Sequence, residues 1–154
     1  MQPYFENLGK RIIKSPKLYF VDVGLAAHLN GIETSTELQK HALKGALVEN
    51  LVVLELFKQR YNLGKSPNLY FFRDSHHCEV DLVYKNANEL IPIEVKSSHT
   101  FNPRFLKGLK YFQALAPERI KTGYLLYNGD IEQPIQGFQL LNILNLTKIF
   151  TSIF

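Results

Sequence analysis

Two short segments of alternating apolar and polar residues, 79–84 and 91–96, constrain the fold of this chain most strongly. An alternation with a period of two residues is typical of a β-strand with one buried face. The residues between the two segments, 85–89, are turn formers, so the pair is predicted to form a β-hairpin. Alternation places Glu79, Asp81 and Val83 on one face of the first strand, Glu94 and Lys96 on one face of the second, and Ile91, Ile93 and Val95 on the opposite face. Charges on a half-buried hairpin are unfavourable unless they pair or bind a metal ion.

The segments around the hairpin predict an α/β fold with a mixed sheet flanked by helices. The sequence Thr34-Ser35-Thr36-Glu37 matches a capping box, and the helix that it opens is predicted to run to about Asn62, with Gly64 as its end. Asp22 is predicted to cap a short helix that ends at Asn30-Gly31. The remaining expected elements are strands at 18–21, 68–73, 123–127 and 138–141, a helix at 103–116 and a short apolar C-terminal helix. Segment 68–73 and the hairpin would form three successive antiparallel strands.

Glu49 is predicted to point from the long helix into the fold. At about 100° per residue it lies nearly opposite a solvated arc formed by Lys40, Lys44, Glu55, Lys58 and Gln59. Its neighbours one turn away are small or apolar. Two interpretations remain open: Glu49 joins the acids of the hairpin, or it is a buried carboxylate satisfied by Arg60, Arg73 or a backbone amide.

The acids and the lysine of the hairpin suit a hard divalent cation, Mg²⁺ or Mn²⁺. Such ions prefer oxygen ligands, which Asp81, Glu94 and the backbone carbonyl of Val95 would supply. Lys96 would lie beside the metal, orient or help deprotonate a water, and stabilise charge on a phosphoryl oxygen. Glu49 would bind the metal directly, bind it through water, or hold a second ion.

These residues also carry a family resemblance. Asp81 followed by Glu94-Val95-Lys96 resembles the PD-(D/E)xK nuclease signature, with Glu49 in the position of its helix-borne acid. The segments 17–25, Glu49-Asn50, 79–81 and 93–96 together resemble the C-terminal domain of unknown function 4143, which follows an AAA+-type ATPase module in many bacterial and archaeal proteins. The resemblance spans roughly residues 14–127. Two positions depart from the pattern: Val80 replaces the proline before the aspartate, and Gln113 is followed by Pro117, so the Gln-x-x-x-Tyr motif of RecB-type relatives is absent.

The resemblance implies a restriction-endonuclease-like fold and a metal-dependent DNA phosphodiesterase whose ATPase partner lies outside this chain. Residues 1–154 would form a single nuclease-like domain, with residues 1–17 as the tail of an upstream ATPase or winged-helix region. Phosphate contacts are expected from nearby cations, namely Arg73, Arg104, Lys107 and Lys110. Two alternatives remain: a catalytically inactive nuclease-fold module that binds DNA or its ATPase, and a structural salt-bridge cluster in which Lys96 neutralises Asp81 and Glu94.

Composition narrows the function classes. The 154 residues suffice for one domain with a real core. The net charge of +4 gives slight support to a polyanionic partner. No apolar run approaches the roughly 20 residues of a membrane helix. The lone Cys78 fits a reducing compartment, so we expect a cytoplasmic protein that is not bound to a membrane.

Two short motifs do not predict a site. Gly64-Lys65-Ser66 resembles the end of a phosphate-binding loop but follows a helix rather than a strand, so no ATP site is predicted. His76-His77-Cys78 lacks a second pair of zinc ligands. Strand specificity, DNA versus RNA and oligomeric state stay open.

Overall fold

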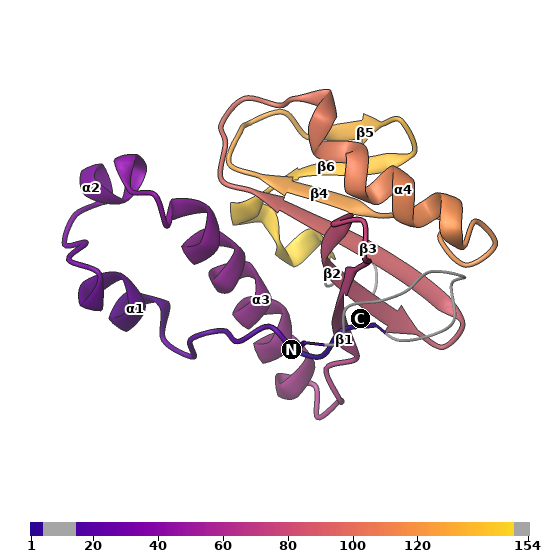
Figure 1. The fold of residues 1–154 in the computed structure, drawn as a ribbon, viewed down its shortest axis with the longest axis horizontal. Coiled ribbons are helices and arrows are strands. Elements are labelled where there is room, and N and C mark those ends of the chain that lie inside the picture. The colour runs from indigo at the N-terminus through magenta and orange to yellow at the C-terminus, as the bar shows by residue number, and fades with distance from the viewer. Residues whose placement is uncertain (5–14, 150–154) are drawn as a thin grey trace.

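A mixed β-sheet forms the centre of the fold (Figure 1). The computed structural model describes residues 1–4 and 15–149, and within them the sheet has six strands in the order β1-β2-β3-β4-β6-β5. Strands β1, β2 and β3 are antiparallel, β4 pairs in parallel with β3 and β6, and β5 pairs antiparallel with β6. The helices are α1 (Val23–Leu29), α2 (Ser35–Lys40), α3 (Lys44–Asn62) and α4 (Lys107–Leu115), with 3₁₀-helices η1 (Pro103–Leu106) and η2 (Ile143–Asn145). The strands are β1 (Leu69–Arg73), β2 (Glu79–Asn86), β3 (Glu89–Lys96), β4 (Tyr124–Tyr127), β5 (Gln133–Ile135) and β6 (Phe138–Asn142).

The predicted hairpin and the mixed α/β fold are confirmed. Strands β2 and β3 pair in the register Leu82↔Ile93 and Tyr84↔Ile91, and β1 extends them into the predicted three-stranded meander. The expected helix at 103–116 is η1 followed by α4, and the strands expected at 123–127 and 138–141 are β4 and β6. Strand β5 was not predicted, because its three residues carry no alternating pattern long enough to recognise.

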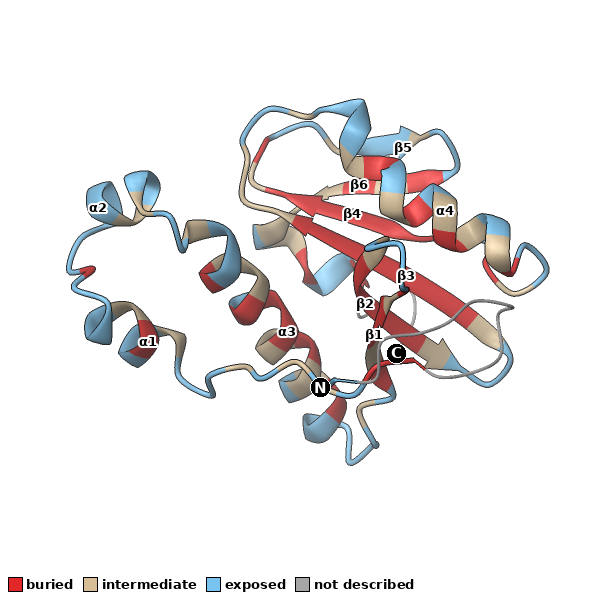
Figure 2. Cartoon of the chain, viewed as in Figure 1, coloured by how far each residue is buried: buried red, intermediate tan, exposed pale blue. Residues whose placement is uncertain are grey.

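Different helices cover the two faces of the sheet. The central strands are buried along most of their length (Figure 2). One core lies under α4, where Leu109 and Phe112 pack against Val83 and Leu125 of the sheet. The second core lies under α3, where its apolar side chains meet the hairpin residues that alternation assigned to the buried face. These contacts involve Val52, Val53 and Leu56 of α3 with Leu82, Ile91, Ile93 and Val95 of the sheet. Each helix therefore stabilises one face through burial of apolar area.

The predicted long helix is interrupted, and one predicted strand is wrong. The capping box at Thr34 and Glu37 is present, but α2 ends at Lys40, where His41 adopts an extended backbone and its ring accepts a hydrogen bond from the Leu43 amide. The break separates α2 from α3, and α2, α1 and the start of α3 share a small core of their own, formed by Ala26, Ile32 and Leu47 with Leu38 against it. Segment 18–21 forms no strand, because the backbone N–H and C=O of Phe20 bond to the Asn50 side chain instead of a neighbouring strand.

A β-bulge interrupts the alternation of β2. The register runs Tyr70↔Val83 and then Phe72↔Val80, so two residues of β2, Asp81 and Leu82, lie opposite Phe71 alone. Strict alternation would separate Val80 from Val83, whereas both line the core under α4. Bulges re-aim side chains, and this one lies at the candidate aspartate.

The residues predicted to begin or end helices α1 and α3 are found at those helix ends. Asp22 caps α1 by accepting from the Leu25 amide, and Gly31 follows this helix with φ of 72°. Gly64, with φ of 65°, ends α3, as predicted.

Across the described ranges, no helix has the length and apolar character needed to cross a membrane. Most of the predicted N-terminal tail (5–14) and the end of the predicted C-terminal helix (150–154) lie outside the described residues.

Candidate active site

Asp81, Glu94 and Lys96 lie together on neighbouring strands, as predicted, although the bulge in β2 interrupts the alternation that placed Asp81 on one face with Val83. Lys96 Nζ donates to Glu94 Oε1 at 2.5 Å and lies 3.8 Å from Asp81 Oδ2. Asp81 Oδ2 also accepts a hydrogen bond from the Val95 backbone N–H at 2.9 Å. The bulge in β2 and the face of β3 that carries Glu94 and Lys96 thus bring two carboxylates and one ammonium into contact.

Both carboxyl groups are buried, and burial changes their acidity. Asp81 is 8% exposed and Glu94 is 7% exposed. Burial raises the pKa of Glu94 to about 8, with repulsion from the Asp81 carboxylate adding to the shift. Burial and the charge of Glu49 likewise raise the pKa of Asp81. For Lys96, burial lowers the pKa, but attraction to the two acids outweighs it and the net shift is upward.

One oxygen of this centre lacks a hydrogen bond. Among the residues that the structure describes, buried Glu94 Oε2 has no hydrogen-bond partner. The start of α4 packs closely beside it: a Cβ at Gly108 would lie 3.5 Å from Glu94 Oε2 and 2.4 Å from the Glu79 carbonyl oxygen. Glycine is therefore needed at 108 for the helix to approach the acids. An unsatisfied buried carboxylate oxygen is unfavourable and calls for an explanation.

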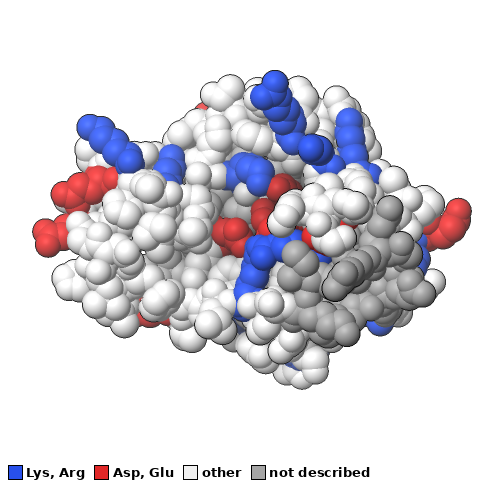
Figure 3. Space-filling view, viewed as in Figure 1, with Lys and Arg blue, Asp and Glu red and all other residues white. Residues whose placement is uncertain are grey.

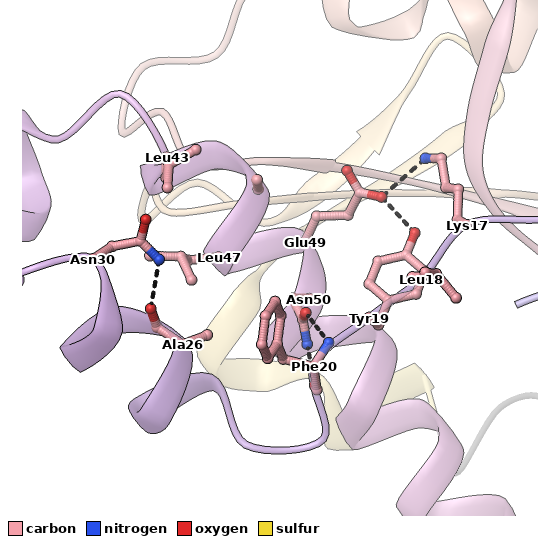
Figure 4. Close-up of a pocket in the computed structure, with 11 residues that line it drawn as sticks. Lys17, Leu18, Tyr19, Phe20, Ala26, Asn30, Leu43, Leu47, Glu49 and Asn50 are labelled. Atoms are coloured by element: carbon pink, nitrogen blue, oxygen red, sulfur yellow. Dashed lines mark hydrogen bonds and ion pairs between the residues drawn. The ribbon is translucent and has the colours of Figure 1, made fainter.

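Glu49 does point inward from α3, but the partners proposed from sequence are not the ones that bind it. Its Oε1 accepts hydrogen bonds from Lys17 Nζ at 3.0 Å and from the Tyr19 hydroxyl at 2.6 Å (Figure 4). Burial and the charge of Glu49 raise the pKa of Tyr19, so this phenol remains a donor. Arg73, named as a possible partner, binds Glu79, and Arg60 donates to the Ser66 carbonyl.

The site also contains Lys17 and Tyr19, which were not predicted as site residues. Lys17 also forms an ion pair with Glu79 Oε1, whose other oxygen accepts from Arg73 Nε at 2.8 Å. Asn50, next to Glu49, holds the same segment by donating to the Phe20 carbonyl and accepting from the Phe20 amide, each at 2.8 Å. The sequence signal for this contact is the motif at 17–25 together with Glu49-Asn50, both of which carry the family resemblance.

The full cluster contains charges of both signs, which gather in the central hollow of the face in Figure 3. Counted over residues 1–4 and 15–149, the ion pairs described here join four carboxylates to three cations. The carboxylates are Glu49, Glu79, Asp81 and Glu94, and the cations are Lys17, Arg73 and Lys96. Across the same part of the chain, no three His, Cys, Asp or Glu residues already converge as a metal-binding group. In addition to Asp81 and Glu94, the Val95 carbonyl, water and substrate are candidate ligands.

A pocket adjoins the cluster. It has a volume of about 380 Å³ and lies between segment 17–20, α1 and α3, with Glu49 in its wall (Figure 4). Its other lining is mostly apolar, including Ala26, Leu43 and Leu47.

The cations expected to contact phosphate divide into two groups. Arg73 is occupied by Glu79 and lies over the Phe71 ring. Arg104, Lys107 and Lys110 are exposed on η1 and α4, and Lys110 donates to Gln136. Their role in binding stays a prediction.

The fold and site define an α/β domain with a buried carboxylate–lysine centre. Residues 44–148 match the family described as "Domain of unknown function (DUF4143)", and residues 1–36 match a second, DUF8612. The chain belongs to the DUF4143 family. Two relatives, the uncharacterized proteins Mb2031c of Mycobacterium bovis and Rv2008c of Mycobacterium tuberculosis, are each 29% identical over 135 residues. The alignment covers 88% of this chain but only 29% of each relative.

Proposed function

We propose that this domain is a Mg²⁺-dependent nuclease with a restriction-endonuclease-like fold, acting on DNA at the centre formed by Asp81, Glu94 and Lys96. The observation that carries the proposal is the buried Glu94 Oε2, which lacks a hydrogen bond within the described part of the chain. A divalent cation held by the two carboxylates would satisfy this oxygen and compensate the buried charge.

The residues present fit magnesium better than a softer metal. Asp81 and Glu94 provide carboxylate oxygens, and the Val95 carbonyl is a further candidate ligand. Mg²⁺ typically takes one or two protein carboxylates and completes its shell with water and substrate phosphate. When bound, the ion would supply Lewis-acid activation of the phosphodiester and a more acidic water.

Lys96 is the residue proposed to act on the reacting atoms. Its ammonium lies beside both acids, at 2.5 Å from Glu94 Oε1, on a strand that holds it in place. A fixed positive charge at this position would orient a water and stabilise negative charge that develops on the phosphoryl oxygens. The exposed Arg104, Lys107 and Lys110 would contact the DNA backbone, which positions a substrate without reading its sequence.

The partner in this proposal is an AAA+-type ATPase module, which the family resemblance implies. The great length of the two mycobacterial relatives supports a role for the domain within longer proteins. Activity of the isolated chain and of the longer protein should therefore both be assayed.

The proposal is tested by metal binding and cleavage in parallel. Wild type is expected to bind Mn²⁺ in calorimetric titration and to nick plasmid DNA with Mg²⁺. Glu94→Gln should lose both, whereas Lys96→Met should still bind Mn²⁺ and lose cleavage by about 10²–10³-fold. Glu55→Gln is the matched control, because Glu55 pairs with Lys58 on the outer side of α3.

Two results would contradict the proposal. No binding at millimolar Mn²⁺ would favour a structural ion-pair cluster, which gains no stability from metal, or an inactive nuclease-fold module. Equal residual cleavage by Glu94→Gln and Lys96→Met would identify a contaminating nuclease.

A further inference from the structure

Lys17 lies where carboxylates from two different elements converge. Its Nζ is 3.0 Å from Glu49 Oε1 of α3 and also pairs with Glu79 Oε1 of β2. Only 16% of the Lys17 side chain is exposed, and its ammonium lies 5.4 Å from the centre of the Phe71 ring. Two converging carboxylates around a buried positive charge are also the environment that a hard divalent cation selects.

The cluster therefore contains two carboxylate pairs, each with its own lysine. Lys96 contacts Glu94 and Asp81, and Lys17 contacts Glu49 and Glu79. The pairs differ in how far the protein satisfies them. The Glu94 pair retains an oxygen that, within the described ranges, has no hydrogen bond.

The Glu49 pair, in contrast, is well supplied with donors. Glu49 Oε1 accepts from Tyr19 as well as from Lys17, and Glu79 Oε2 accepts from Arg73. The segment that brings Lys17 is itself fixed by the two hydrogen bonds between Phe20 and Asn50. The protein thus supplies its own cation at this pair and leaves the other pair incompletely compensated.

We propose that Lys17 is a tethered cation that occupies the position of a second divalent ion. The centre then binds a single ion, at Asp81 and Glu94, and Glu49 is a positioning residue that anchors Lys17 and is not a metal ligand. The single-ion statement rests on the proposed nuclease function. The assignment of Lys17 concerns the Glu49–Glu79 pair and is measured separately.

Removing the charge of Lys17 should convert this pair into a metal site. Without Lys17, the partly buried Glu49–Glu79 pair keeps only Arg73 as a cation, at Glu79. The loss of charge compensation is unfavourable. A divalent ion restores the charge and can be held by two carboxylates and water. Binding to the folded state then stabilises it by mass action.

The experiment counts bound Mn²⁺ by electron paramagnetic resonance and equilibrium dialysis, and follows thermal unfolding in EDTA and in Mn²⁺. Wild type, Lys17→Arg and Glu49→Gln should each bind one ion. Lys17→Met should bind two, unfold at a lower temperature in EDTA, and gain more from Mn²⁺ than wild type. Lys17→Met combined with Glu94→Gln should keep one ion, at Glu49 and Glu79.

Each alternative outcome decides a specific point. Two ions in wild type, one ion in Lys17→Met, or none in the double variant would overturn the assignment. No ion in wild type but one in Lys17→Met would reject the nuclease proposal and uphold the role of Lys17. If Lys17→Met does not fold in EDTA, Lys17→Gln keeps a hydrogen-bonding side chain without the charge, and the same count of two ions is expected.

Discussion

Asp81 of β2 accepts a hydrogen bond from the backbone N–H of Val95 in β3, with 2.9 Å between Oδ2 and N. The regular pairing of the two strands reaches Leu82↔Ile93, so the Asp81 side chain bonds the neighbouring strand just beyond this pair. The carboxylate is thereby held against the strand that carries Glu94. A backbone donor, and not only charge attraction, sets the geometry of the candidate centre.

This contact predicts different results for two substitutions of Asp81. Asp81→Asn retains an oxygen that can accept from Val95, so we expect near wild-type stability but weak Mn²⁺ binding. Asp81→Ala leaves the buried Val95 N–H without its partner and should cost about 1–3 kcal/mol in the free energy of unfolding. Urea denaturation and Mn²⁺ titration of both variants provide the measurement. Equal losses of stability in the two variants would show that the hydrogen bond contributes little.

The acidity of Glu94 predicts the pH dependence of the metal-free protein. Its pKa lies at about 8 in the folded protein, chiefly because of burial, against an ordinary value of 4.5. A carboxyl group with a raised folded-state pKa stabilises the protein below the unfolded value, and this contribution is lost as pH rises through the folded value. Thermal unfolding in EDTA should therefore show stability falling from about pH 4.5 to pH 8. Glu94→Gln should show a flatter profile, and an equally steep profile would assign the effect to other groups.

The close approach of α4 to the acids predicts that Gly108→Ala is damaging. The new methyl group would lie 2.4 Å from the Glu79 carbonyl oxygen, so α4 must shift, at about 1–3 kcal/mol in the free energy of unfolding. The shift should also weaken Mn²⁺ binding. Gly45→Ala in α3 is the control, because its nearest neighbour is the Ser97 hydroxyl at 3.9 Å, and alanine should stabilise that helix by up to about 1 kcal/mol. Similar unfolding curves for the two variants would contradict this packing.

The Asn50 side chain holds segment 17–20 in place, so its removal should loosen this segment. Asn50→Ala removes two hydrogen bonds to the Phe20 backbone and should cost about 1–3 kcal/mol in the free energy of unfolding. Hydrogen exchange at the Phe20 amide should increase at the same time. Asn62→Ala, an exposed change at the end of the same helix, is the control. Unchanged exchange at Phe20 in Asn50→Ala would show that other contacts fix the segment.

The exposed cations on η1 and α4 predict salt-dependent DNA binding. Replacing Arg104, Lys107 and Lys110 with alanine should weaken binding of duplex DNA and reduce the slope of log affinity against log salt by about 2–3. The control replaces Lys40, Lys58 and Lys121, which are also exposed and lie outside η1 and α4. Fluorescence anisotropy at several salt concentrations measures both slopes. Equal losses in the two sets would indicate non-specific attraction to a basic protein.

Much of the sheet could be predicted because its signals are local. Alternation at 91–96 correctly separated Ile93 and Val95, which lie in the core under α3, from Glu94. The expectation of one buried face was wrong, because β2 and β3 are buried on both faces. Alternation could not predict the bulge at Asp81, since the bulge depends on the pairing of β2 with β1. The break between α2 and α3 at His41 could not be predicted either, because the helical pattern continues across it. The packing of α2 beside α1 and α3 depends on tertiary contacts.

The sequence by itself determined the hairpin, the faces of its second strand and the meeting of Asp81 with Glu94 and Lys96, because these follow from strand period and short-range pairing. Only the tertiary structure decided the surroundings of Glu49. Lys17 and Tyr19 precede it by 32 and 30 residues, and no periodic signal links positions so distant. Their contact with Glu49 depends on the hydrogen bonds between Asn50 and Phe20 and on the packing of α3 against the sheet. Tertiary packing therefore decided which cations lie beside the acids.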